Sequence, residues 1–233
     1  MINIYKSESR YNANHGWLNS RFSFSFAEYM DHDNILFGPM RVLNDDRVAG
    51  HRGFGMHPHQ EMEIVSLVLE GHLQHEDSKG HKAVTTFGEI QRMSAGTGIY
   101  HSEVNPSTEE VHFFQMWFLP EVQGLTPSYE KTAYDITKMK NNLLPVVTKN
   151  PDSNEVAHIH QDLTIYLSDI EAGYTIPYKQ AEGRRIFIMV IEGDIAINGG
   201  ETLTTGDSAR ITDTTDVEIT STNGGRFMFI DLP

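Results

Sequence analysis

The stretch that decides the fold is VSLVLEG at residues 65–71, an apolar run that ends in Glu-Gly. A similar run, IFIMVIEG, stands at residues 186–193. Short apolar runs that end at a glycine turn are typical of buried β-strands, and the rest of the chain shows little long helical periodicity. Because the second half repeats the first, we predict an all-β fold built from two related β domains.

The boundary between these domains is predicted from length and turn residues. At 233 residues the chain is long enough for one large core or two smaller ones. Prolines and polar residues between positions 120 and 154 are typical of a connection. We therefore predict an N-terminal domain over residues 1–125, a linker region over 126–154 and a C-terminal domain over 155–233.

One helix is expected inside the linker region. Ala133, Ile136 and Met139 give weak helical spacing there. The pattern predicts a helix between Ser128 and Lys140.

Composition excludes several classes of function. The chain is 39% hydrophobic and 21% charged, which is typical of a compact protein rather than a disordered one. A net charge of −14 without a Lys/Arg cluster argues against nucleic acid as a partner. The absence of Cys leaves His and carboxylate as the strong metal ligands. With no leader or membrane-length apolar segment evident, we expect a soluble, cytoplasmic protein that binds no membrane. Nothing in the sequence demands an interface, so we expect a monomer.

Two short motifs carry the chemistry: HPH at residues 57–59 and HSE at residues 101–103. In an extended strand, residues i and i+2 point to the same face, so each motif presents two metal-binding side chains together. Such a donor set suits iron, nickel, copper, manganese or cobalt, and it leaves positions of an octahedral shell open for substrate and dioxygen. The spacing therefore predicts an enzymatic metal site formed by His57, His59, His101 and Glu103.

Histidine pairs also arise by chance in a chain with 12 His. His158 and His160 have the same spacing but no second pair nearby, so we interpret them as structural or surface residues. Gly-containing stretches at 53–55 and 94–98 precede the two motifs and favour the metal site. Aligning the two halves on their glycines predicts one site per chain, because the C-terminal counterparts of the four ligands are Lys179, Ala181, Ile219 and Ser221.

Further stretches of the N-terminal half resemble the pirin family of cupin proteins. They are HGWL at residues 15–18, FSFSFA at 22–27, RVLNDD at 41–46, EMEI at 61–64 and MSAGTGI at 93–99. The resemblance implies a bicupin fold, in which two antiparallel β-barrel (jelly-roll) domains lie face to face. It also implies one divalent transition metal per chain, with iron favoured and nickel, copper, manganese, cobalt or zinc as alternatives. The implied ligands are His57, His59, His101 and Glu103.

The resemblance also bears on a second acidic residue, Glu63. Glu63 stands where many other cupins supply their carboxylate ligand, but in pirins this role falls to the position of Glu103. We expect Glu63 either to lie just behind the ligands or to be a hydrogen-bonded, partly solvated carboxylate near the mouth of the pocket.

Bacterial pirin-like proteins resemble quercetin 2,3-dioxygenases, which implies oxygenative cleavage of a flavonol ring with release of carbon monoxide. The partners are then a small aromatic substrate and dioxygen, and Glu103 is the candidate catalytic base for the flavonol hydroxyl. Side chains alternate between the two faces of a strand, so only every second residue of the 113–118 strand can face a pocket. Most of its aromatic residues can instead be interpreted as part of the barrel core. Candidates to line the pocket are Phe54, Tyr100, Phe113, Phe114 and Trp117.

Two other functions stay open. Eukaryotic pirins are associated with transcription-factor partners and with iron-dependent redox sensing, which implies a regulatory metal-binding protein as the alternative. A metal-dependent isomerase, or another cupin enzyme acting on a small acid or sugar, is a weaker alternative. Such pockets need several cations, and the motif regions offer chiefly Arg52 and Arg92.

Overall fold

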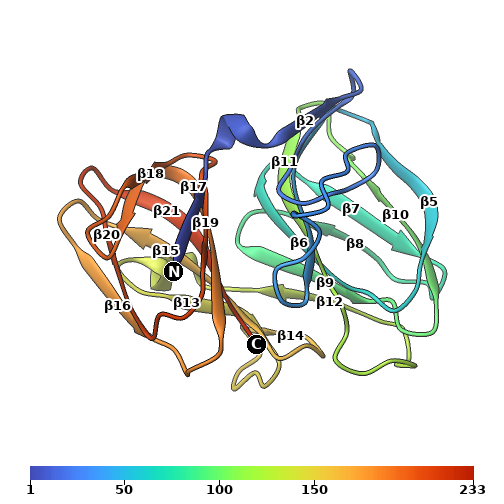
Figure 1. Cartoon of the computed structure of the whole chain (residues 1–233). Coiled ribbons are helices and arrows are strands. Elements are labelled where there is room, and N and C mark those ends of the chain that lie inside the picture. Colours follow the sequence, from blue (N-terminus) through green and yellow to red (C-terminus); the bar gives the residue numbers. More distant parts are fainter. The chain divides into compact units, whose positions relative to one another are not determined.

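The computed structural model describes residues 1–233, and each of its two compact units consists of antiparallel strands (Figure 1). The N-terminal unit comprises Tyr11–Tyr134 and Lys149–Gln161. The C-terminal unit comprises Met1–Arg10, Asp135–Thr148 and Asp162–Pro233. The bounds interleave because the first residues of the chain pair with the C-terminal sheet, and residues 126–154, expected as a linker region, are divided between the units.

The N-terminal unit holds two antiparallel sheets that do not close into a barrel. The larger has the strand order β12-β9-β6-β11-β4-β3-β2, and the smaller has the order β5-β10-β7-β8. The strands are β2 (Tyr11–Asn14), β3 (Leu18–Phe22), β4 (Met40–Val48), β5 (Gly53–His59), β6 (Glu63–Glu70), β7 (Leu73–Asp77), β8 (Lys82–Thr85), β9 (Glu89–Ser94), β10 (Ile99–Val104), β11 (Val111–Phe118), β12 (Ser128–Ala133) and β14 (Ala157–His158).

The C-terminal unit is built on the strand order β1-β19-β17-β21-β15-β13, with β18 and β20 pairing to β17 and β16 pairing to β20. The strands are β1 (Ile2–Tyr5), β13 (Leu144–Thr148), β15 (Thr164–Ile170), β16 (Thr175–Lys179), β17 (Arg185–Ile197), β18 (Thr202–Thr204), β19 (Ser208–Ile211), β20 (Asp216–Thr220) and β21 (Gly225–Leu232). Two short 3-10 helices complete the chain: η1 (Ser7–Ser9) and η2 (Ile136–Met139).

The two units repeat one topology, as the sequence predicted. The order β12-β9-β6-β11-β4-β3 of the first matches β1-β19-β17-β21-β15-β13 of the second, strand for strand. The run at 65–71 lies on β6 and the run at 186–193 on β17, and their glycines, Gly71 and Gly193, both adopt a left-handed backbone with φ of 79° and 75°. One difference is that β17 continues through Gly193 to Ile197, so it spans the lengths of both β6 and β7.

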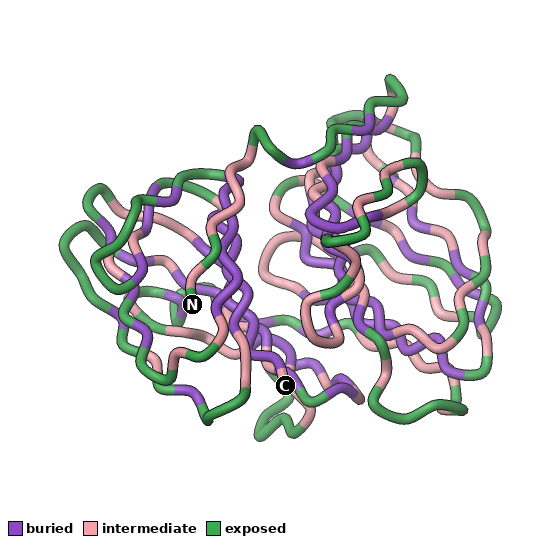
Figure 2. The backbone as a smooth tube through the Cα atoms, in the orientation of Figure 1, coloured by how far each residue is buried: buried purple, intermediate pink, exposed green.

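Buried residues concentrate on the central strands, and exposed residues gather in the connecting turns (Figure 2). Strand β6 is buried on both faces from residue 63 to 68, which explains why its sequence is mostly apolar rather than alternating; Glu63 and Ser66 are the buried exceptions. Burial of each large apolar side chain stabilises the fold by about 1.5–3 kcal/mol. The C-terminal core alone gathers 14 buried apolar residues from β15 to β21.

The helix predicted between Ser128 and Lys140 is wrong. Residues 128–133 form β12, which pairs with the edge of β9 over six residues, and this backbone pairing outweighs a weak helical pattern. Only 136–139 turn helically, as η2, where the side chain of Asp135 accepts a hydrogen bond from the N–H of Thr137. No helix in the structure is long and apolar enough to cross a membrane.

Gly53 is expected to be intolerant of a side chain. A Cβ there would lie 2.5 Å from Cα of Val104 on the neighbouring strand, whereas a Cβ at Gly55 would meet no atom within 4 Å. Gly53→Ala should therefore lower the free energy of unfolding by about 1–3 kcal/mol through overpacking. Urea unfolding of the metal-free protein measures this effect, with Gly55→Ala as the matched control. Equal stability of the two variants would contradict the close approach of β5 and β10.

Candidate metal centre

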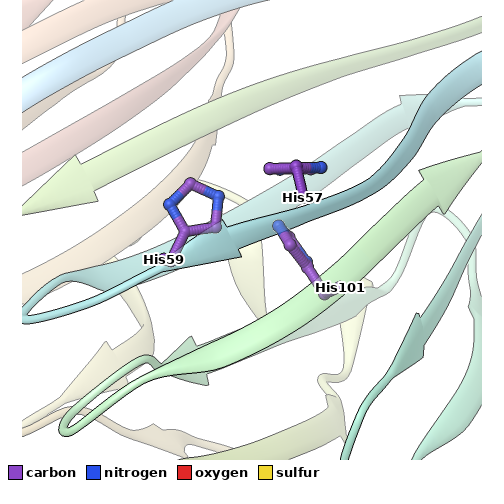
Figure 3. Close-up of side chains that lie close together, drawn as sticks. All are labelled: His57, His59 and His101. Atoms are coloured by element: carbon purple, nitrogen blue, oxygen red, sulfur yellow. The ribbon is translucent and has the colours of Figure 1, made fainter.

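Strands β5 and β10 bring the predicted histidines together (Figure 3). His57 is paired directly opposite His101, and His59 is paired opposite Ile99. His57 and His59 are two residues apart on one strand, so both rings project from the same face. The three rings converge, with centroids 4.4 to 4.9 Å apart.

The chemistry of these side chains fits a transition metal. One nitrogen from each of the three rings lies within 4.8 Å of the others, and this is the only such group in the chain. The Nε2 atoms of His59 and His101 are buried and have no hydrogen-bond partner, which is costly unless another ligand takes their lone pairs. Nδ1 of His57 lies 2.7 Å from the carbonyl oxygen of Gly55, to which it donates. This bond leaves the lone pair of His57 on Nε2.

Electrostatics keep two of the rings neutral. Burial, followed by the charges of His101 and His57, lowers the pKa of His59 to about 4. Burial, followed by the charges of His57 and His75, lowers the pKa of His101 to about 3. Near neutral pH both rings are therefore unprotonated bases, the form in which imidazole binds metals.

Glu103 lies on the same strand as His101 but has neutral protein partners. Its side chain is buried, and its Oε1 accepts hydrogen bonds from Ser66 Oγ at 2.9 Å and Gln91 Nε2 at 2.7 Å. Its Oε2 accepts a hydrogen bond from Gln115 Nε2. The converging group of ligand atoms consists of the three histidines, so a role for Glu103 as fourth ligand stays a prediction.

Glu63 lies among a different set of residues. It is 1% exposed, and its Oε2 accepts hydrogen bonds from Ser94 Oγ at 2.8 Å and from the N–H of His160 at 3.3 Å. The rings of His158 and His160 contact each other edge to face, with centroids 4.6 Å apart, and both residues are half-buried. The structure thus associates Glu63 with the second histidine pair rather than with the converging rings.

A cavity of about 630 Å³ opens beside His57, within the size range of small-molecule sites. Its polar lining is Asn44, Asp46, Gln115, Ser20, His15, Glu28 and His57, and its aromatic lining is Trp17, Phe22, Phe26, Phe54 and Trp117. The aromatic rings contact one another edge to face, as in Trp17 with Phe54 at 5.5 Å and Phe26 with Trp117 at 5.3 Å. Such contacts make stiff apolar walls.

One acidic group in this cavity, the carboxyl of Asp46, has a raised pKa. Burial raises the pKa of Asp46 to about 7, against the hydrogen bond that Ser20 donates to it. The carboxyl is therefore partly protonated near neutral pH, and it is available both as a donor and as an acceptor.

Of the five aromatics suggested for the pocket, Phe54 and Trp117 line the cavity. Phe113 and Phe114 are fully buried in the core, and Tyr100 is 55% exposed because its strand parity is opposite to that of His101. Sequence reasoning missed Ser66, Gln91 and Gln115 around Glu103. The signal for them was a polar residue inside an otherwise buried strand, where burial requires a hydrogen-bond partner.

Comparison with known proteins identifies the family. Residues 5–118 match the family described as Pirin, and residues 146–232 match the Quercetinase C-terminal cupin domain. A quercetin 2,3-dioxygenase of Escherichia coli K12 is 40% identical over 235 residues, which cover 100% of this chain and 99% of that protein. The chain belongs to the pirin family.

Solved structures agree with this membership. The crystal structure of the bacterial pirin YhhW from Escherichia coli matches with a TM-score of 0.95 and 39% identity, covering 100% of this chain and 98% of that chain. A nickel(II) complex of YhhW matches with a TM-score of 0.94 and 38% identity, covering 100% and 99%. These matches confirm the predicted all-β, bicupin fold of jelly-roll type.

Removal of one converging ring should weaken metal binding. Changes in groups that only support a ligand typically cost 10–100-fold in affinity, so His57→Ala, which deletes a donor atom, should cost at least about 100-fold. Titration of the metal-free protein with Ni²⁺ by calorimetry measures this. His158→Ala removes a histidine of the same spacing and should bind like the wild type. An equal loss in both variants would contradict the assignment of the site.

Proposed function

We propose that this pirin-family chain is a metal-dependent dioxygenase that cleaves a flavonol such as quercetin and releases carbon monoxide. The observation that carries the proposal is the position of His57, which belongs both to the converging histidines and to the wall of the aromatic cavity. A substrate in this cavity therefore lies next to the metal-binding atoms. The name of the Escherichia coli relative, which is 40% identical over the whole chain, supports the same reaction.

In this proposal one divalent metal is held by His57, His59, His101 and Glu103. The three converging imidazoles and the nickel(II) complex of YhhW support a divalent ion. Iron is the metal we favour, with nickel, copper, manganese, cobalt and zinc as alternatives. When bound, the metal supplies a Lewis acid that stabilises an anionic substrate oxygen beside dioxygen.

The cavity residues bind and orient the substrate. A flavonol is flat and largely apolar, with hydroxyl groups at its edges, which suits a pocket with aromatic walls and few polar groups. Trp17 and Phe54 form one such wall, and Asn44, Asp46 and Gln115 offer hydrogen bonds to hydroxyl groups. Orientation of the reacting carbon toward the histidines is the main contribution of these residues to the rate.

Glu103 is the proposed base. It would accept the proton of the flavonol 3-hydroxyl, so that the substrate reacts as its anion. Ser66, Gln91 and Gln115 are neutral donors that fix the orientation of its two oxygens. Trp117 Nε1 donates to Gln115 Oε1 at 3.1 Å, so the amide of Gln115 presents its nitrogen to Glu103.

Turnover is expected to require metal and the converging histidines. Protein reconstituted in turn with iron, nickel, copper, manganese or cobalt should consume quercetin and dioxygen together and release carbon monoxide. His59→Ala should abolish this turnover, and His158→Ala should retain it. Loss of quercetin absorbance, dioxygen uptake and carbon monoxide release are the measurements. Stoichiometric metal binding without turnover for any metal would refute the proposal and favour the regulatory alternative.

The role of Glu103 as base predicts a separate effect. Glu103→Gln keeps the shape of the side chain but cannot take up the proton, so kcat per bound metal should fall about 10²–10⁴-fold. Metal content measured on the same samples separates loss of the base from loss of a ligand. The control is Glu110→Gln, which changes an exposed carboxylate that forms an ion pair with Arg47. Full turnover of Glu103→Gln at normal metal content would exclude this role.

A further inference from the structure

His101 contacts a second, fully buried histidine through its other ring nitrogen. Nε2 of His101 has no partner, whereas its Nδ1 lies 3.4 Å from Nδ1 of His75. His75 is 0% exposed and takes no part in the converging group. A buried histidine that contacts a ligand without being one calls for an explanation other than packing alone.

His75 leads on to a carboxylate and then to the surface. Nε2 of His75 lies 2.9 Å from Oδ2 of Asp77, and Nδ1 of His81 lies 2.9 Å from the same oxygen. The side chain of Asp77 is fully buried, while that of His81 is 42% exposed. The row His101, His75, Asp77 and His81 therefore runs from the metal-binding group to solvent.

Strand register fixes this row. On β7 and β10, Asp77 is paired opposite His101 and His75 is paired opposite Glu103. The ring of Tyr129 stacks on His75 with centroids 4.2 Å apart and on His81 at 5.5 Å. The rings are thus held from the side as well as through their hydrogen bonds.

The direction of each hydrogen bond follows from the carboxylate. An ionised carboxylate only accepts, so Nε2 of His75 carries its proton toward Asp77. A neutral imidazole has one N–H, which leaves a lone pair on Nδ1 of His75. The two facing Nδ1 atoms need one proton between them, and it belongs to His101. The lone pair of His101 is then on Nε2, the atom that faces the other two histidines.

We propose that Asp77 and His75 are positioning residues that set the tautomer of His101, so that its Nε2 lone pair is always available to the metal. Partners behind a metal-binding histidine commonly fix its ring and tautomer in this way. Here the partner is itself an imidazole that a carboxylate orients. The inference rests on the proposed metal site but not on the proposed reaction.

The turn after β7 holds Asp77 independently of His75. Its Oδ1 accepts hydrogen bonds from the backbone N–H of Lys79 at 2.9 Å and from that of His81 at 3.1 Å. In Asp77→Asn the amide oxygen therefore stays with these backbone donors, and the NH2 group replaces Oδ2. That NH2 group donates to His75, moves the proton of His75 to Nδ1 and moves the proton of His101 to Nε2.

The first test uses the metal-free wild type. Long-range ¹⁵N–¹H spectra of assigned histidine rings report which nitrogen carries the proton. We expect Nε2–H for His75 and Nδ1–H for His101. A proton on Nε2 of His101, or a doubly protonated His75 that donates to both neighbours, would overturn the proposal without any variant.

The second test uses Asp77→Asn. The spectra should show the proton of His101 moved to Nε2, and Ni²⁺ affinity should fall about 10–100-fold. Glu76→Gln, an exposed carboxylate one residue earlier on β7, is the matched control and should leave both readouts unchanged. Wild-type affinity of Asp77→Asn with an unchanged His101 tautomer would refute the proposal.

A third variant covers the case in which Asp77→Asn does not fold. His75→Phe keeps a ring stacked on Tyr129 but removes the acceptor for His101, so Ni²⁺ affinity should fall by a similar factor. Unchanged affinity would overturn the proposal. All three tests use metal binding or spectra without quercetin, so failure of the proposed reaction would not affect them.

Discussion

The register of β10 between β5 and β7 is the constraint on which the whole site depends. Backbone pairing places His57 opposite one side of His101 and Asp77 opposite the other. Because side chains alternate along a strand, a slip of one residue would turn His101 and Glu103 to the opposite face. Two features lie along this pairing: Gly53, where a Cβ would collide with β10, and the irregularity between His101 and Glu103.

The two units use one topology for different ends. Strands β5 and β10 of the N-terminal unit have β16 and β20 as their counterparts, and these contribute Ile176, Val217 and Ile219 to an apolar core. Apolar side chains fill that space without any need for partners. In the N-terminal unit, His75, His101 and Glu103 are buried instead, and each polar atom then needs a partner. This need accounts for Ser66, Gln91 and Gln115, which serve one carboxylate.

The sequence was sufficient for features that depend on local spacing. Residues i and i+2 share a face in any strand, so His57 and His59 were predictable without knowledge of the sheet. The groups around Glu103 were not, because Ser66, Gln91 and Gln115 lie on three different strands whose order no local pattern specifies. The incorrect prediction of a helix between Ser128 and Lys140 has a related cause. The edge of β9 offered residues 128–133 a backbone partner, and only the tertiary structure reveals that edge.

The balance of charge in the site argues for a cation near Glu103. All three hydrogen-bond donors to this buried carboxylate are neutral, and a buried anion without a paired cation is costly. The cost of burying a negative charge is also seen at Asp46, where burial raises the pKa to about 7 and the charges of Asp45 and Glu103 act in the same direction. Two of the converging histidines bring no positive charge of their own, because burial keeps His59 and His101 neutral. Under the proposed function, a divalent metal held by these rings supplies the missing positive charge. The neutrality of His59 and His101 is also what makes these two imidazoles good ligands, because only an unprotonated ring nitrogen can bind a metal.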